Sequence, residues 1–391
     1  MRLTLGIGRR NAWVLIALMA VSLCVAIQAL PAHAQSFNTS ADQAFLIDLD
    51  TRAVLLEKSA DEPMVPASMA KLMTIELVFA ALQDGRISMQ DEVLISERAW
   101  RMRGSRMFAE VGSEITIENL IQGVIVHSGN DAAVALAEAM AGSEEAFAEM
   151  MTQRAAELGM TNTRFANSTG LSDPAQLTTA RDMATLAIHL IETYPSYYHY
   201  FAQPDFTWND INQRNRNPLL NRDIGVDGLK TGQLDESGYG LVASAVQDGQ
   251  RVVLVVHGLS TARQREDEAF KILTWGLRTF EPLELYAAGE EVARVPIYGG
   301  AVDRVGATGE RPVVVMVERG VERADLRGRL VYEWPVEPPV EPGNEIALLR
   351  VFHEERIVAE VPLFAMESVE EGAIHRRALD SALEFFAQML Q

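Results

Sequence analysis

The sequence predicts an α/β or α+β domain of roughly 245 residues, followed by a small all-β domain. Two observations carry this prediction. Up to about residue 281, runs with a helical period are mixed with short strand-like runs. Beyond that point, short β-branched runs are separated by turn-rich segments such as residues 335–343. The 391 residues, 48% of them hydrophobic, are enough for about two or three domains.

The elements of the first domain follow from local patterns. Within residues 43–57 two apolar runs flank Asp-Leu-Asp-Thr-Arg, which predicts a β-hairpin. Pro66-Ala67-Ser68 opens a helix that keeps its apolar period over 69–82 and closes at Gly85. Strands joined by a polar turn are expected at 240–246 and 251–257. Further helices are expected at 115–136, 144–158, 179–192 and 266–279.

The C-terminal part is predicted to be β-rich and to end in a helix. Strands are expected at 313–317, 330–334, 346–351 and 356–362. Residues 370–391 have the pattern of an amphipathic helix, with apolar residues along one side. Such a tail suits a membrane interface or another protein surface, and its shortage of Lys and Arg leaves both readings open.

The first 34 residues have the composition of a secretory signal peptide. Arg2, Arg9 and Arg10 precede an apolar run over 13–30, and Ala32-His33-Ala34 has the form of a signal peptidase site. An uncleaved N-terminal anchor is the alternative, because the run is long for a signal peptide. Cleavage after Ala34 would remove three Arg and the single cysteine, taking the formal net charge from −20 to −23. The chain is therefore expected to be exported and periplasmic.

Charge and residue spacing exclude some functions. A net charge of −20 without a Lys/Arg-rich run argues against nucleic-acid binding. The histidines, among them His127, His189 and His257, show no metal-ligand spacing, so neither a metal nor a cofactor is expected. We accordingly divide the chain into a signal peptide (1–34), a catalytic domain (35–281), an all-β domain (282–366) and a helical tail (367–391).

Three short patterns occur in order along the predicted catalytic domain. They are Ser68-Met69-Ala70-Lys71, Ser128-Gly129-Asn130 and Lys230-Thr231-Gly232. Each alone is weak, since S-x-x-K is common where a serine caps a helix and a lysine faces solvent. Together they supply the groups that a serine acyl-transfer enzyme needs.

The chemistry assigns a role to each group. A serine hydroxyl is a poor nucleophile unless a neighbouring base takes its proton, and Lys71 is three residues from Ser68 on the same helix face. Lys71 can be that base only if burial and a second cation, Lys230, lower its pKa. We expect Ser128 to relay protons and Asn130 to bind the substrate backbone.

The sequence resembles the low-molecular-mass penicillin-binding proteins, the serine-type D-alanyl-D-alanine carboxypeptidases of the S11 peptidase kind. The three patterns match S-x-x-K, S-x-N and K-T-G of penicillin-binding proteins and β-lactamases. Residues 46–74, 128–138, 158–171, 226–232, 237–245 and 273–281 read like members of this family. The resemblance covers essentially the whole mature chain. It implies a β-lactamase-like (penicilloyl-serine transferase) domain with an antiparallel sheet flanked by helices, then a small β-sandwich and an amphipathic tail.

The resemblance also implies substrate-binding residues. Thr231 and Gly232 would hold the terminal carboxylate together with Arg265 or Arg216, and Ser105 lies in a segment that matches a mobile active-site loop of the family. The oxyanion hole would be the backbone N–H groups of Ser68 and Gln233. Relatives commonly have His-Thr after K-T-G, where this chain has Gln233-Leu234. This departure puts side-chain tuning of substrate preference in doubt, but not the backbone donor.

The expected function is removal of the terminal D-alanine from peptidoglycan stem pentapeptides, in cell-wall biosynthesis and cell shape, with β-lactams as covalent inhibitors. A class A β-lactamase is disfavoured, because residues 168–182 contain no glutamate to activate the deacylating water. An endopeptidase that cuts D-Ala cross-links stays open, and a catalytically inert cell-wall scaffold is the alternative from another class. A Ser-His triad using His127 is disfavoured by the absence of a G-x-S-x-G elbow.

Overall fold

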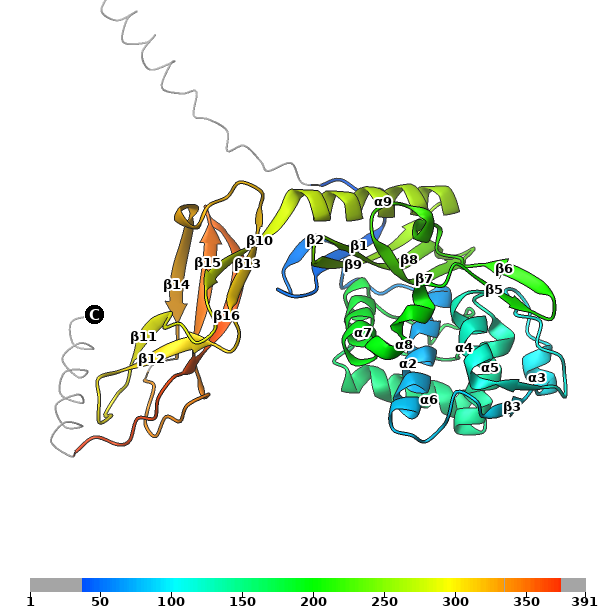
Figure 1. Ribbon diagram of the computed structural model, residues 1–391, viewed down its shortest axis with the longest axis horizontal. Coiled ribbons are helices and arrows are strands. Elements are labelled where there is room, and N and C mark those ends of the chain that lie inside the picture. The colour runs from blue at the N-terminus through cyan, green and yellow to red at the C-terminus, as the bar shows by residue number, and fades with distance from the viewer. Residues whose placement is uncertain (1–36, 334, 374–391) are drawn as a thin grey trace, which may run out of the picture. The chain divides into compact units, whose positions relative to one another are not determined.

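The computed structural model describes residues 37–333 and 335–373 (Figure 1). The predicted signal peptide, Trp334 and residues 374–391 of the predicted tail lie outside the described residues. No helix within the described part of the chain is long and apolar enough to cross a membrane.

The catalytic half is built on a five-stranded antiparallel sheet. Its strand order is β2-β1-β9-β8-β7, so that β7 forms an edge. The strands are β1 (Gln43–Asp48), β2 (Val54–Lys58), β7 (Val226–Leu234), β8 (Gly238–Gln247) and β9 (Gln250–Leu259). The central strand β9 carries the run Val252–Val256, which is buried throughout because helices cover both faces of the sheet.

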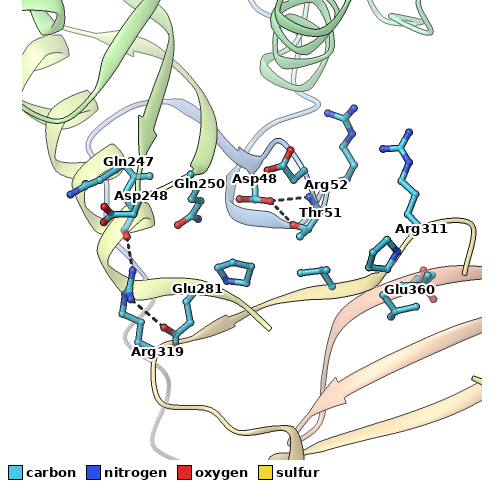
Figure 2. A pocket seen from close by; sticks show the side chains of 18 of the residues that line it. Asp48, Thr51, Arg52, Gln247, Asp248, Gln250, Glu281, Arg311, Arg319 and Glu360 are labelled. Atoms are coloured by element: carbon cyan, nitrogen blue, oxygen red, sulfur yellow. Dashed lines mark hydrogen bonds and ion pairs between the residues drawn. The ribbon is translucent and has the colours of Figure 1, made fainter. Parts of the chain in front are cut away.

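The predicted N-terminal hairpin is confirmed. Asp48, which is 2% exposed, closes the turn between β1 and β2: its Oδ1 accepts hydrogen bonds from the backbone N–H and the hydroxyl of Thr51, at 2.9 and 2.7 Å (Figure 2). Short aspartate-to-backbone bonds of this kind stabilise tight turns.

Helices cover the two faces of the sheet unequally. One face carries α9 (Ala262–Thr279) and the other the remaining helices (Figure 1). These are α2 (Lys71–Gln83), α3 (Glu97–Trp100), α4 (Ile117–Ile125), α5 (Asn130–Ala141), α6 (Glu144–Glu157), α7 (Ala180–Thr193) and α8 (Pro195–Tyr198). Because α2 is apolar almost all round, it is buried and contacts α4, α5, α6 and α7. The hairpins β3 (Glu92–Leu94)–β4 (Glu114–Thr116) and β5 (Asp205–Trp208)–β6 (Ile211–Arg214) complete this half, with single 3₁₀ turns at Ala67–Ala70, His199–Ala202 and Pro218–Asn221.

The structure corrects the predicted helix over 115–136. Residues 114–116 form β4, and the helix is two helices, α4 and α5, interrupted at 126–129. Ser128 adopts a left-handed backbone with φ 59°, and Gly129 N–H returns to the carbonyl of Gly123. Apolar residues keep the helical period through the interruption, so periodicity alone cannot reveal it. The predicted start of α9 is also four residues late, because the side chain of Thr261 caps the helix by accepting from Gln264 N–H.

The C-terminal half is all-β, as predicted. It contains a five-stranded antiparallel sheet, β11-β12-β16-β15-β14, and the pair β10–β13, around one apolar core. The strands are β10 (Phe280–Tyr286), β11 (Ala293–Pro296), β12 (Arg304–Gly309), β13 (Val313–Glu318), β14 (Leu326–Val331), β15 (Glu345–His353) and β16 (Arg356–Ala365), with a 3₁₀ turn at Arg323–Asp325. Strands β10, β11 and β12 have no counterpart in the sequence-based prediction. After β13, Arg319 pairs with Glu281 of β10 at 3.1 Å (Figure 2).

A glycine controls how closely the loop before α7 approaches the start of α2. Gly170 has φ +79°, and a Cβ added there would lie 1.8 Å from the carbonyl oxygen of Ala67. Gly159, with φ +80°, has nothing within 4 Å of the corresponding position. We expect Gly170→Ala to lower the free energy of unfolding by at least ~3 kcal/mol, and Gly159→Ala by only ~1 kcal/mol, the cost of the left-handed backbone alone. Urea unfolding of both variants measures the difference, and equal losses would contradict the packing argument.

Candidate active site

Ser68 and Lys71 lie where a 3₁₀ turn runs into α2. The turn Ala67–Ala70 continues without interruption into the helix, whose first residue is Lys71. Ser68 is partly exposed, whereas Lys71 is 0% exposed, and its Nζ lies 3.1 Å from Ser68 Oγ. The spacing of three residues therefore brings the amine to the hydroxyl, as the sequence predicts.

Strands β7 and β8 pack closely against this turn. A Cβ added at Gly232 would lie 2.9 Å from the carbonyl oxygen of Pro66, and one added at Gly240 would lie 2.9 Å from Met69 Cε. Side chains at either position would push the sheet away from the serine. Gly232 thus contributes through its lack of a side chain.

The second amine and hydroxyl meet opposite the first pair. Lys230 on β7 is 2% exposed and donates from Nζ to Ser128 Oγ at 2.9 Å and to the carbonyl of Thr231 at 3.2 Å. Ser128 is 4% exposed and reaches Lys230 from the interruption between α4 and α5. Its left-handed backbone costs about 1–2 kcal/mol, the kind of local strain that is concentrated at functional sites.

Burial makes both amines less basic. Burial is the main cause that lowers the pKa of Lys71 to about 7, while the carboxylates of Asp131 and Glu144 act in the opposite direction. The pKa of Lys230 lies well below its ordinary value, first because of burial and then because of the positive charges of Lys71, Arg216 and Arg265. A neutral amine is thus accessible near neutral pH.

A carbonyl group that the sequence does not single out orients Lys71. Lys71 Nζ donates to the carbonyl of Thr169 at 2.5 Å. The preceding residue is fixed by Glu144, whose Oε1 accepts from Ser168 N–H at 3.2 Å and from Ser168 Oγ at 2.8 Å. Glu144 is 6% exposed and also pairs with Arg98 at 2.8 Å. Neither Glu144 nor Thr169 has a sequence signature, because both act through tertiary contacts.

A cavity of about 350 Å³ opens beside the serines. Its lining consists of Ser68, Ser105, Ser128, Arg216, Thr231, Gly232, Gln233, Tyr239, Ala262 and Arg265. The structure therefore brings the predicted substrate-binding residues together with two of the predicted catalytic ones. Lys71 and Lys230 are buried and reach the cavity through the serine hydroxyls that they contact.

Of the two arginines considered for a substrate carboxylate, one is built into the wall. Arg265 on the first turn of α9 is 8% exposed, its Nε has no hydrogen-bond partner in the described structure, and its guanidinium lies 5.8 Å from the ring centre of Tyr239. Burial lowers its pKa from the ordinary value. Arg216 is exposed. A buried guanidinium with an unsatisfied donor is suited to bind an anion.

Asn130 and Ser105 are joined through the loop 103–109. The side-chain amide of Asn130 donates to the carbonyl of Arg103 at 2.6 Å, and its backbone N–H donates to the carbonyl of Ser105 at 2.8 Å. Asn130 does not line the cavity. Ser105 lines the cavity, so the loop 103–109 forms one lip of it. Asp131, which the sequence-based prediction omits, fixes the same loop.

The histidines have structural partners. His127 is buried, with Nε2 2.9 Å from the carbonyl oxygen of Phe206 and Nδ1 3.3 Å from Gln213 Nε2, so both ring nitrogens have partners other than Ser68 and Ser128. His189 lies 3.1 Å from Glu76. Within residues 37–333 and 335–373, no group of three His, Cys, Asp or Glu side chains is arranged to hold a metal ion.

The fold and this cleft define a penicillin-binding protein with an α/β catalytic domain and a C-terminal β domain. The chain belongs to the D-alanyl-D-alanine carboxypeptidase family Peptidase_S11, which matches residues 29–261, and it has the activity for which the family is named. Residues 280–371 match the C-terminal domain of penicillin-binding protein 5.

Individual relatives agree with this assignment. D-alanyl-D-alanine carboxypeptidase DacC of Escherichia coli (strain K12) is 37% identical over 350 residues, which is 88% of either chain. Penicillin-binding protein 5 from Haemophilus influenzae superimposes with a TM-score of 0.78 at 35% identity, over 86% of this chain and 99% of that one. Penicillin-binding protein D2 from Listeria monocytogenes, in its ampicillin-bound form, gives a TM-score of 0.57 at 29% identity, over 62% and 98%.

The buried Lys71 amine is expected to destabilise the folded state at neutral pH. Because its pKa falls from 10.5 to about 7, the folded protein carries the full cost of the buried charge below pH 7 and loses this cost as the pH rises toward 10.5. Lys71→Met should therefore raise the free energy of unfolding at pH 7 by ~3 kcal/mol, and by much less at pH 10. Urea unfolding at both pH values tests this. The exposed Lys271→Met should change little at either pH, and a Lys71→Met gain independent of pH would contradict the explanation.

Proposed function

We propose that Ser68 is the nucleophile with which this carboxypeptidase removes the terminal D-alanine from peptidoglycan stem pentapeptides, and that Lys71 is its base. The observation that carries the proposal is the convergence of two amine–hydroxyl pairs, Lys71–Ser68 at 3.1 Å and Lys230–Ser128 at 2.9 Å, on one cavity. A buried lysine with a pKa of about 7 has enough neutral amine at physiological pH to accept the serine proton.

The acylation step starts at the penultimate D-alanine carbonyl. Ser68 Oγ forms a bond to the carbonyl carbon while its proton passes to Lys71. The resulting oxyanion accepts hydrogen bonds from the backbone N–H groups of Ser68 and Gln233. When the carbon–nitrogen bond breaks, the leaving amine takes a proton from Ser128, which regains one from the neighbouring amines.

Hydrolysis then regenerates the enzyme. Water attacks the acyl-Ser68 ester and gives a proton to Lys71, and Lys71 passes this proton to the ester oxygen, which leaves as the Ser68 hydroxyl. The products are the shortened peptide acid and free D-alanine. No metal or other cofactor takes part in this scheme.

The edge strand β7 gives the substrate its direction. Thr231 and Arg265 line the cavity and would hold the substrate carboxylate, and Gln233 comes two residues after Thr231 on the same strand. A peptide whose terminal carboxylate lies at Thr231 and whose reacting carbonyl lies at Gln233 runs along β7 as an added strand. Asn130, at the start of α5, would bind the peptide backbone.

The same geometry supports acylation by β-lactams. A penicillin presents a reactive carbonyl and a carboxylate in one small molecule, and the related Listeria monocytogenes protein D2 has been crystallised with ampicillin. We therefore include penicillins among the ligands that acylate Ser68. Stem-peptide profiling decides between carboxypeptidase and endopeptidase preference.

The chain's division and location are part of the proposal. A boundary near residue 281 agrees with the junction of α9 and β10 and with the start of the second family match at residue 280. Thus residues 35–281 form the serine peptidase domain and 282–366 the β domain. Residues 1–34 direct export to the periplasm. Residues 370–391 offer a surface for the inner membrane or for another protein, although Val369 and Glu371 still pair with Val340 and Gly300 of the β domain, so that a separate tail can begin only after these residues.

Ser68→Ala tests the nucleophile. We expect D-alanine release from a synthetic D-Ala-D-Ala pentapeptide to fall by at least ~10³-fold, because the other active-site groups retain only weak catalysis without the nucleophile. Mass spectrometry after penicillin treatment should show an adduct on the wild type and none on the variant. Ser113→Ala, at a serine that does not line the cavity, is the control. Unchanged release by Ser68→Ala would exclude this mechanism, and an inactive wild type would favour a scaffold.

The carboxylate site is tested by comparing two arginines. Losing a charged hydrogen bond costs ~1.5–3 kcal/mol, so Arg265→Gln should lower kcat/KM by roughly 10- to 100-fold. Arg216→Gln should lower it by less than ~5-fold, because an exposed charge is screened. With a peptide whose terminal carboxylate is replaced by an amide, the two substitutions should have the same effect on kcat/KM. A larger loss for Arg216→Gln with the free acid would assign the carboxylate to Arg216 instead.

A further inference from the structure

One carboxylate joins the start of α5 to the loop that forms the lip of the cavity. Asp131, on the first turn of α5, is 1% exposed. Its Oδ1 accepts from Met107 N–H at 3.0 Å and from Ala132 N–H at 3.0 Å. Its Oδ2 accepts from Phe108 N–H at 2.9 Å and from Ala109 N–H at 3.1 Å. Three consecutive amides of the loop thus bind a single side chain.

This arrangement differs from ordinary helix capping. An acidic residue in the first turn normally serves its own helix, yet only the Ala132 N–H bond of Asp131 does so. The neighbouring Asn130 holds the carbonyls of Arg103 and Ser105. The two residues therefore bind complementary groups of one loop, amides through Asp131 and carbonyls through Asn130.

The loop is held from its other side by the β5–β6 hairpin. Gln213 Nε2 donates to the carbonyl of Arg106 at 3.0 Å, and Asn209 Nδ2 donates to the carbonyl of Phe108 at 3.3 Å. These bonds satisfy polar backbone groups that would otherwise allow the loop many conformations. Phe108 also has a left-handed backbone, with φ 70°. A residue in this conformation persists only when surrounding contacts determine it.

The backbone around Asp131 is adapted to its position. A Cβ added at Gly129 would lie 2.8 Å from Asp131 Oδ1 and 3.2 Å from Met107 N. The glycine between Ser128 and Asn130 therefore admits the carboxylate and the loop together. This gives the central residue of the Ser-Gly-Asn pattern a steric role beside the two side chains that flank it.

We propose that Asp131 is a positioning residue of the active site, which fixes the loop 103–109 against α5 so that Ser105 lines the cavity together with Gln233. The proposal rests on the proposed function only for its kinetic consequences. The placement of the loop is a structural claim that can be tested separately. Asp131 does not line the cavity and acts through the loop and through its charge.

The charge of Asp131 also reaches the base. Among the charged groups that face Lys71, the carboxylates of Asp131 and Glu144 raise its pKa against the larger effect of burial, and Lys230 is the neighbouring cation. Removing the Asp131 charge should lower the Lys71 pKa below about 7. The acid limb of the acylation rate, where Lys71 becomes protonated, then moves to lower pH.

Asp131→Asn tests the positioning role directly, because all four hydrogen bonds of the Asp131 carboxylate are accepted from backbone N–H donors. An asparagine amide can accept through only one atom, so two N–H groups must face its NH₂ whichever way it turns. Hydrogen–deuterium exchange at residues 107–109 should become at least ~10-fold faster. With a D-Ala-D-Ala pentapeptide, KM should rise by roughly 10-fold, and the acid limb of penicillin acylation should move down by a measurable fraction of a pH unit.

A matched control and a second variant separate the effects. Asp182, in the first turn of α7, is 5% exposed and accepts from Asn162 N–H and Thr163 Oγ1 away from the cleft. Asp182→Asn should leave the exchange at 107–109, KM and the pH profile unchanged. Gln213→Ala removes the bond to the Arg106 carbonyl on the other side of the loop, together with the contact to His127. It should speed exchange in the loop and raise KM, while the acid limb stays in place.

The outcomes are decisive for the proposal. Unchanged exchange at 107–109 in folded Asp131→Asn overturns it, as does faster exchange with unaltered KM and pH profile. Equal effects in Asp182→Asn would reduce Asp131 to a general stabilising role. If Asp131→Asn does not fold, Gln213→Ala decides, and an unaltered KM there overturns the positioning role. A wild-type protein that penicillin does not acylate contradicts the proposed function, while the exchange experiment still reports on the loop.

Discussion

The proposed active site depends on two buried lysine amines. Lys71 and Lys230 are 0% and 2% exposed, so burial lowers the pKa of both amines, and the charge of Lys71 lowers the pKa of Lys230 further. In water both would be protonated, and neither could take a proton from a serine. Only a desolvated position, with a carbonyl and a hydroxyl as partners for each Nζ, makes a weak base of an ordinary lysine. The surrounding fold provides that position.

The architecture brings three distant segments to one point. The 3₁₀ turn before α2 supplies the Ser68–Lys71 pair, the interruption between α4 and α5 supplies Ser128, and β7 supplies Lys230. Glycines at 129, 170 and 232 allow backbone to meet backbone where a Cβ would intervene. The carboxylates of Asp131 and Glu144 each hold one flanking loop and also counter part of the desolvation of Lys71. The same two carboxylates therefore position the loops around the site and influence the pKa of Lys71.

Sequence alone predicts most of this, and its failures have physical causes. The fold class and the family follow from the order of elements and from three short patterns. Periodicity missed the interruption at Ser128, because the apolar residues on its two sides stay in phase. It missed Glu144 and the Thr169 carbonyl, because only the tertiary fold brings them near Lys71. In the sequence, Glu144 follows Lys71 by 73 positions and Thr169 follows it by 98. It also left Arg265 and Arg216 equivalent, since burial separates them and a single sequence does not report burial.

The open edge of the sheet has a consequence beyond substrate alignment. An unpaired strand such as β7 can also pair with a strand of another molecule and start aggregation. Here the turn before α2 lies directly over the edge, with Pro66 and Met69 in contact distance of position 232, and the exposed end of β7 continues into Asp235 and Glu236. The acidic residues at the end of the strand repel the same residues of another copy, which disfavours pairing between two such edges.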